Sequence, residues 1–212
     1  MPNVAWAISG GLLALCGFRL SERLYRAIIR ELSLQRRPLP VWGYFVSSLI
    51  GLVTGWRAGS GETVREIVSL FVVASLLVIQ APLDASIHRL SRPVTMVSLA
   101  CVLVAGAMDG IANQRVSVAL LGIAMASGAC GVYALIHAVS PRSIGWGDVL
   151  LILPLAIALA PQGFGTVFTW QLSASLTGSL HAVSLRLTAG VRSIPFGPHL
   201  LAGAWLVLVF SL

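Results

Sequence analysis

The sequence predicts an all-α protein, a polytopic bundle of about eight transmembrane helices, and two observations lead to this class. Of the 212 residues, 57% are hydrophobic and only 10% are charged, whereas a soluble domain has about 25% charged residues. The apolar residues also come in runs whose lengths approach the roughly 20 residues that a helix needs to cross a bilayer. The chain lacks the polar side chains to cover itself in water, so we expect a single membrane domain over residues 1–212.

Eight apolar runs along the chain predict the eight helices. The second, sixth and eighth runs are short for a membrane span, and the turn between the fourth and fifth is tight. The sixth and seventh runs meet at the sequence "APQG", where proline and glycine favour a hairpin turn. The predicted spans are residues 3–20, 41–56, 64–83, 94–112, 116–139, 148–161, 163–185 and 198–212.

The arginines lie in alternate connections and predict the orientation of the helices. The connections after the first, third, fifth and seventh spans hold most of them, and the others hold only Arg57, Arg65 and Arg115. The arginine-rich segment after the first span is predicted to be an amphipathic extension of that span followed by a loop. Basic residues are retained on the cytoplasmic side of membrane proteins, so those four connections are predicted to be cytoplasmic and both termini to face outward. Positive charge spread over short loops also argues against a nucleic-acid partner. The arginines concerned are Arg19, Arg23, Arg26, Arg30, Arg36, Arg37, Arg89, Arg92, Arg142, Arg186 and Arg192.

Cysteine and histidine show no metal-binding pattern. Cys16, Cys101 and Cys130 lie singly inside apolar runs, and the sequence contains no Cys-x-x-Cys pair. The histidines are scattered along the chain, so each is expected to be a loop or interfacial residue. We therefore expect neither a metal nor another cofactor. The four histidines are His88, His137, His181 and His199.

The chemistry is expected at the aspartates. On the predicted topology Asp84 and Asp148 lie at the cytoplasmic ends of helices and Asp109 at the opposite side. Ionisable residues at membrane depth usually face the bundle interior or a watery cavity. If Asp84 and Asp148 converge, like-charge repulsion leaves one protonated and one ionised, the arrangement that activates water for peptide hydrolysis. Topology alone favours a plainer alternative, in which Asp148 caps a helix and Asp84 lies in a polar loop. Asp109 is expected to be a helix-end polar residue.

Glycines and prolines beside these positions favour the catalytic interpretation. Gly145 and Gly147 stand on either side of Trp146, just before Asp148. Glycine permits close backbone approach, which a simple helix cap does not require. The stretch "SIPFGPHLLAG", residues 193–203, interrupts the chain before the last span on the same predicted side. Irregular backbone at that depth is tolerated where protein or water covers it, and it offers unpaired backbone groups to an extended peptide.

These elements together resemble a known family. The stretch "GWGDVLL" resembles the GxGD motif of intramembrane aspartyl proteases, and the ordered set is similar to the type IV prepilin leader peptidases. The resemblance covers residues 64–212, whereas residues 1–63 match only through an arginine-rich segment after the opening span. The matching positions are Asp84 with Thr95 eleven residues later, then Gly145, Gly147 and Asp148, and finally Pro195, Phe196, Gly197 and Pro198.

The resemblance implies a membrane-embedded aspartyl endopeptidase that removes the leader peptide of type IV pilin-like precursors. It implies that Asp84 and Asp148 share the acid and base work on a water molecule. The implied location is the bacterial cytoplasmic membrane, as a multi-pass protein with its active site facing the cytoplasm. The implied partners are the precursor proteins and the lipid bilayer.

Two departures from the family pattern limit what the resemblance implies. Ser91-Arg92 stands where relatives carry Pro-Asp or Pro-Asn, which motivates an alternative: a non-catalytic membrane scaffold or a small proton- or cation-coupled transporter. The inverted repeats and mid-membrane acidic residues typical of transporters are not visible in the sequence. The segment "ELSLQRRPLP" replaces the cysteine-rich insert of many relatives. The S-adenosylmethionine-dependent N-methylation of those relatives is therefore not expected here.

Overall fold

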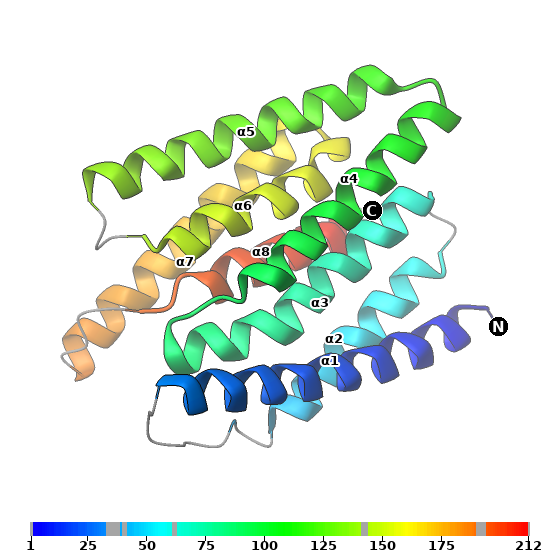
Figure 1. Ribbon diagram of the computed structural model, residues 1–212. Coiled ribbons are helices and arrows are strands. Elements are labelled where there is room, and N and C mark those ends of the chain that lie inside the picture. Colours follow the sequence, from blue (N-terminus) through cyan, green and yellow to red (C-terminus); the bar gives the residue numbers. More distant parts are fainter. Residues whose placement is uncertain are drawn as a thin grey trace.

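The structure is a computed structural model, and it describes residues 2–32, 39, 42–60, 63–140, 144–189 and 194–211. Within those residues the chain forms eight α-helices and one turn of 3₁₀-helix, with no strand, which confirms the predicted all-α bundle (Figure 1). The helices are α1 (Pro2–Leu32), α2 (Trp42–Ala58), α3 (Val64–Ile87), α4 (Arg92–Ala112), α5 (Val116–Val139), α6 (Trp146–Leu159), α7 (Phe164–Ala189) and α8 (Gly197–Ser211), and η1 (Ala160–Gln162) joins α6 to α7.

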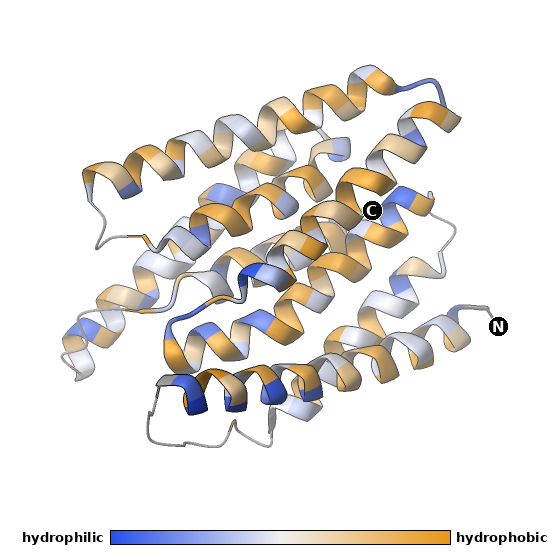
Figure 2. Cartoon of the chain, viewed as in Figure 1, coloured by the Kyte–Doolittle hydropathy of each residue, from blue (hydrophilic) through white to orange (hydrophobic). Residues whose placement is uncertain are grey.

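Hydropathy supports a membrane location for this bundle. Helices α1, α3, α4 and α5 are long and apolar enough to cross a bilayer, whereas α6 with η1 and α8 are apolar but shorter. Hydrophobic residues make up much of most helices, and several of the most hydrophilic segments lie at helix ends (Figure 2). Many large hydrophobic side chains point outward, such as Leu12 of α1, Val104 of α4 and Leu120 of α5. An outward-facing apolar surface of this extent suits contact with lipid.

Helix α6 lies at the centre of the core. Its residues Leu151, Ile152 and Leu155 are fully buried and belong to one hydrophobic cluster with side chains from α3, α5, α7 and α8. A helix that is apolar all round, as α6 is, is expected inside a bundle. Trp170 also links α7 to α8 by a hydrogen bond, because its indole Nε1 donates to the backbone oxygen of Leu200 at 2.8 Å. This packing holds the start of α6 close to α3 and α8.

Helix α1 is longer than the predicted first span. It continues to Leu32, so the arginine-rich segment that begins at Arg19 is helical. Phe18, Tyr25 and Ile29 form the buried side of this extension and pack in a second hydrophobic cluster with residues of α3. Helical spacing therefore leaves the opposite side free for the arginines. Arg36, Arg37, Arg142 and Arg192 lie outside the described residues.

The C-terminal ends of α1, α3, α5 and α7 and the N-terminal ends of α4, α6 and α8 lie at one end of the bundle, on the left of Figure 1. We call this the α1-end. Asp84 is in the last turn of α3, Asp148 in the first turn of α6, and Gly197 begins α8. These three residues therefore share one end of the bundle, as expected from the alternation of arginine-rich connections along the chain. Asp109 belongs to the last turn of α4, at the opposite end.

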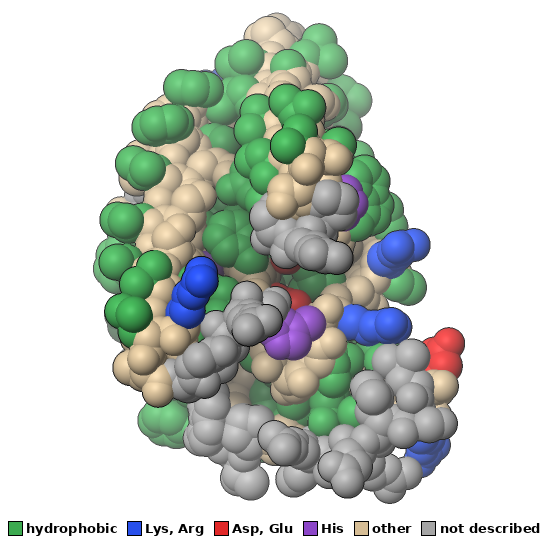
Figure 3. Space-filling view, turned by 90° about the vertical axis from the view of Figure 1, so that its left-hand side faces the viewer, with side chains coloured by type: hydrophobic (Ala, Val, Ile, Leu, Met, Phe, Trp, Pro, Cys, Tyr) green, Lys and Arg blue, Asp and Glu red, His purple; other side chains and the backbone are tan. Residues whose placement is uncertain are grey.

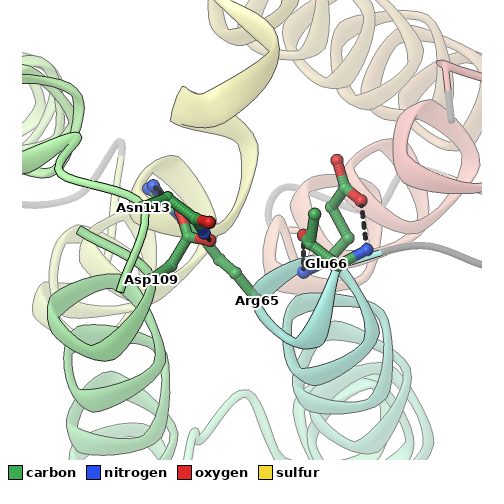
Figure 4. A network of polar contacts seen from close by, with 5 residues as sticks. Arg65, Glu66, Asp109 and Asn113 are labelled. Carbon is green, nitrogen blue, oxygen red and sulfur yellow. Dashed lines mark hydrogen bonds and ion pairs between the residues drawn. The ribbon is translucent and has the colours of Figure 1, made fainter. Parts of the chain in front are cut away.

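Asp109 forms a polar network at that opposite end (Figure 4). Its Oδ2 lies 3.7 Å from Nη1 of Arg65, whose side chain is only 5% exposed, and its Oδ1 accepts a hydrogen bond from Asn113 Nδ2 at 2.8 Å. Arg65 is in the first turn of α3, where Thr63 and Glu66 form a capping box. Asp109 is therefore the counter-charge of a buried arginine, a role that the sequence did not suggest.

We expect Asp109→Asn to lower the stability of the protein without stopping its activity. The substitution leaves the buried Arg65 guanidinium without an opposing charge, which costs about 1–3 kcal/mol. Thermal unfolding in detergent measures the loss, and the double variant Arg65→Leu/Asp109→Asn should recover part of it. An unfolding temperature equal to that of the wild type would show that the pair contributes nothing.

Candidate active site

Asp84 and Asp148 converge at the first residue of α8. The backbone N–H of Gly197 donates to Asp84 Oδ2 at 3.0 Å. A β-carbon built on Gly197 would lie 2.7 Å from Asp84 Oδ2 and 3.4 Å from Asp148 Oδ1. The two carboxylates therefore flank one point, and their oxygens are separated by no more than the sum of these distances. The sequence predicted that they share an end of the bundle but left open whether they meet.

Both carboxylates are largely shielded from solvent. Asp84 is 5% exposed and Asp148 is 9% exposed. Figure 3 faces the α1-end and shows acidic atoms recessed among hydrophobic side chains near its centre. Asp148 Oδ1 is buried and accepts no hydrogen bond from the described residues. A buried oxygen normally has a partner, so this atom is positioned for a water molecule or a substrate group.

Asp148 also performs the capping role that was the plainer alternative. Its Oδ2 accepts a hydrogen bond from the backbone N–H of Gly145, the N-cap residue of α6, at 3.3 Å. One oxygen thus fixes the carboxylate to its own helix, while the other faces Gly197. Capping and convergence on Asp84 occur together, so the two interpretations are not exclusive.

The glycines of the "GWGD" stretch provide space. A β-carbon on Gly145 would lie 3.3 Å from Asp148 Oδ2, and one on Gly147 would lie 3.3 Å from the β-carbon of Leu90. The backbone of Gly145 is extended, so its role does not depend on a left-handed conformation. Gly147 instead lets the α3–α4 turn pack directly against the residue before Asp148. Trp146 is half exposed beside them, as an interfacial anchor is expected to be.

The "PFGP" element forms the irregular entry to α8, and the described residues 194–196 before the helix have no regular structure. Phe196 stacks on Tyr133 of α5 with ring centroids 6.5 Å apart. Its ring also fits against Gly178 of α7, where a β-carbon would lie 2.7 Å away. Pro195 precedes this ring and Pro198 lies in the first turn of α8, where a proline is tolerated. Phe196 thus anchors the turn so that Gly197 reaches Asp84.

Gln80 is a residue of this site that the sequence argument missed. It is fully buried on α3, one helical turn before Asp84. Its Nε2 donates to Thr95 Oγ1 at 2.7 Å, and its Oε1 accepts from the backbone N–H of Ser91 at 2.6 Å. Thr95, which matched the family spacing, is thus a partner of Gln80. The one available signal was a glutamine inside the apolar stretch "LLVIQAPLD".

Two histidines that are far apart in the sequence are in contact. His181 Nδ1 of α7 lies 3.0 Å from His199 Nε2 of α8, so the α7–α8 packing brings them together across 18 residues. His88 instead ends α3 in a left-handed conformation, with φ 51°. No group of three or more potential metal ligands occurs among the residues that the structure describes.

Comparison with known proteins provides no further guide: no family model, curated protein or solved structure matches the chain. The residues of the site are therefore the basis for inferring the function. Two buried carboxylates on different helices, one with an oxygen that has no partner among the described residues, form an arrangement suited to acid–base chemistry on water. They are equally the kind of groups that bind a proton or cation.

Proposed function

We propose that the protein is a membrane-embedded aspartyl endopeptidase in which Asp84 and Asp148 activate a water molecule against a peptide bond. The observation that carries the proposal is the position of the two buried carboxylates on either side of Gly197. Their residue types and order also resemble those of the type IV prepilin leader peptidases.

The proposed mechanism uses the two carboxylates as a pair. Two such groups repel each other when both are ionised, so the resting pair holds one proton. The ionised member accepts a proton from water as the water attacks the peptide carbonyl, and the protonated member donates to the carbonyl oxygen. The first member then passes its proton to the peptide nitrogen as the C–N bond breaks, and the second regains a proton from the diol as the new carboxyl group forms. The proton belongs to the pair and not to either residue. Asp148 Oδ1, which has no hydrogen-bond partner among the described residues, is available to hold the water.

The proposed substrate is the leader junction of a pilin-like precursor at the cytoplasmic face of a bacterial membrane. Two features support this choice. The irregular segment 194–196 lies beside the dyad, where an extended peptide is able to use its backbone groups. The site is also at the arginine-rich end, which the positive-inside rule places in the cytoplasm. Coexpression with a precursor tests the proposal directly, because leader removal changes the mobility of the precursor on a gel.

A proton- or cation-coupled transporter is the second candidate, and the same two buried carboxylates favour it. Their position argues the other way, since Asp84 and Asp148 lie in terminal turns of α3 and α6. Coupling residues of transporters usually lie near mid-membrane, between repeats of the fold. We therefore rank the peptidase above the transporter.

We expect the mature substrate to carry an unmethylated amino terminus and cleavage to survive chelation of zinc. The sequence has three cysteines and no Cys-x-x-Cys pair, so it lacks the zinc-binding insert found in methylating relatives. Mass spectrometry of the new terminus after cleavage by the purified protein, with S-adenosylmethionine present, measures this. A mass gain of one methyl group that depends on this protein alone would contradict the prediction.

A further inference from the structure

We propose that Gln80 is a positioning residue that sets the separation of Asp84 and Asp148 through the α3–α4 turn. The inference rests on the proposed function, because it concerns the geometry of the same dyad. Gln80 does not contact the carboxylates. It acts through a chain of contacts that begins one helical turn before Asp84 and ends at the residue before Asp148.

The first part of this chain is a clamp on one residue of the turn. Gln80 Oε1 accepts from the backbone N–H of Ser91 at 2.6 Å, and Gln80 Nε2 donates to the backbone oxygen of Ser91 at 3.3 Å. The same Nε2 donates to Thr95 Oγ1 at 2.7 Å, and that hydroxyl also donates to the Ser91 oxygen at 3.2 Å. One side-chain amide therefore holds both peptide groups of Ser91, and it does so while fully buried.

The second part carries this constraint to Asp148. Leu90 is the neighbour of Ser91 and packs against the hydrophobic core. A β-carbon on Gly147 would lie 3.3 Å from the Leu90 β-carbon and 3.4 Å from its Cδ1, so Leu90 rests on the backbone of Gly147. A shift of Ser91 would move Leu90 and release Gly147. Asp148 is thereby supported on one side through Gly147, while its Oδ1 lies near Gly197 on the other side.

The clamp also holds Ser91 without using its side chain. Ser91 is the N-cap residue of α4 but makes no side-chain capping hydrogen bond, and its backbone is instead held by Gln80. The turn is thus fixed from α3 and does not require a particular side chain at position 91. The departure from the family pattern is accommodated by this glutamine.

The test measures the separation of the two positions without using peptidase activity. Asp84→Cys and Asp148→Cys are combined after Cys16, Cys101 and Cys130 have been changed to alanine. Dibromobimane is then added, because it fluoresces strongly only when it bridges two nearby thiols. We expect rapid bridging in the parent and a severalfold slower rate when Gln80→Leu is added. In the protein with both aspartates, Gln80→Leu should lower kcat by about 10- to 100-fold with little change in KM.

Gln171→Leu is the matched control. Gln171 is a glutamine of α7 whose side-chain nitrogen and oxygen are buried without a hydrogen-bond partner among the described residues. Its replacement should leave both bridging and kcat unchanged. If Gln80→Leu fails to fold, Leu90→Ala tests the same route at its second step, and it should also slow bridging.

Unchanged bridging in folded Gln80→Leu or in folded Leu90→Ala would overturn the positioning role. Slower bridging in both variants supports the positioning role, and this result does not depend on whether the protein cleaves a precursor. The two proposals therefore fail separately: a wild-type protein that cleaves no precursor contradicts the peptidase, whereas the bridging rates report only on the geometry.

Discussion

Asp84→Asn and Asp148→Asn are each expected to reduce precursor cleavage to below about 1% of the wild-type rate. Asparagine preserves the size of the side chain but exchanges no proton, so either change removes one half of the acid–base pair. Both carboxylates are buried beside Gly197, and the resting pair already holds one proton, so a neutral amide in place of one carboxyl breaks no ion pair. Membrane insertion and thermal stability should therefore remain close to those of the wild type. Gel analysis of a coexpressed precursor measures the cleavage.

Asp109→Asn is the control for these two variants. Asp109 is the third aspartate of the chain and lies at the opposite end, paired with Arg65. Normalised to the amount of folded protein, its cleavage rate should equal that of the wild type. Robust cleavage by either Asp84→Asn or Asp148→Asn would rule out the proposed dyad.

Gly197→Val is expected to lower turnover per folded molecule by about 100-fold or more. The new β-carbon would lie 2.7 Å from Asp84 Oδ2, closer than such atoms approach in proteins, and 3.4 Å from Asp148 Oδ1. The carboxylates must separate to admit it, and the hydrogen bond from the Gly197 N–H to Asp84 is disturbed. The reason is space and not backbone strain, because among the described glycines only Gly163 has a positive φ.

Gly128→Val is the matched control for Gly197→Val. A β-carbon on Gly128 of α5 meets no atom within 4 Å, so turnover should be unchanged. Phe196→Ala should have an intermediate effect, because it loses the stacking on Tyr133 but leaves the space at Gly197 intact. Normal turnover in folded Gly197→Val would show that the reaction does not depend on the space at Gly197.

The fold was predictable because it depends on local features of the sequence. Apolar runs and the loop chemistry between them determine where membrane helices begin and end, and all eight helices are present in the described chain. The main difference is the length of α1, where the buried Tyr25 and Ile29 continue the apolar side past Arg19 and the predicted amphipathic extension is part of the same helix. A search for uninterrupted apolar runs ends at that arginine, although the helix does not.

The site was only partly predictable, because its remaining features depend on packing between distant segments. Asp84 and Asp148 were found through their residue types and spacing, but their approach at Gly197 requires α3, α6 and α8 to meet at one end. The contact between His181 and His199 depends in the same way on α7 and α8. Gln80 has no marker in the sequence except its polarity, and its partners lie on the next helix.

The clearest test of the central claim is cleavage by the purified wild-type protein in lipid nanodiscs, with a pilin-like precursor as the only other protein. Mass spectrometry of the products identifies the bond that is cut. The account predicts a single cut at the leader junction by the wild-type protein and an intact precursor with Asp148→Asn. An intact precursor with folded wild-type protein, or equal cleavage by the variant, would contradict the claim that Asp84 and Asp148 form a peptidase site.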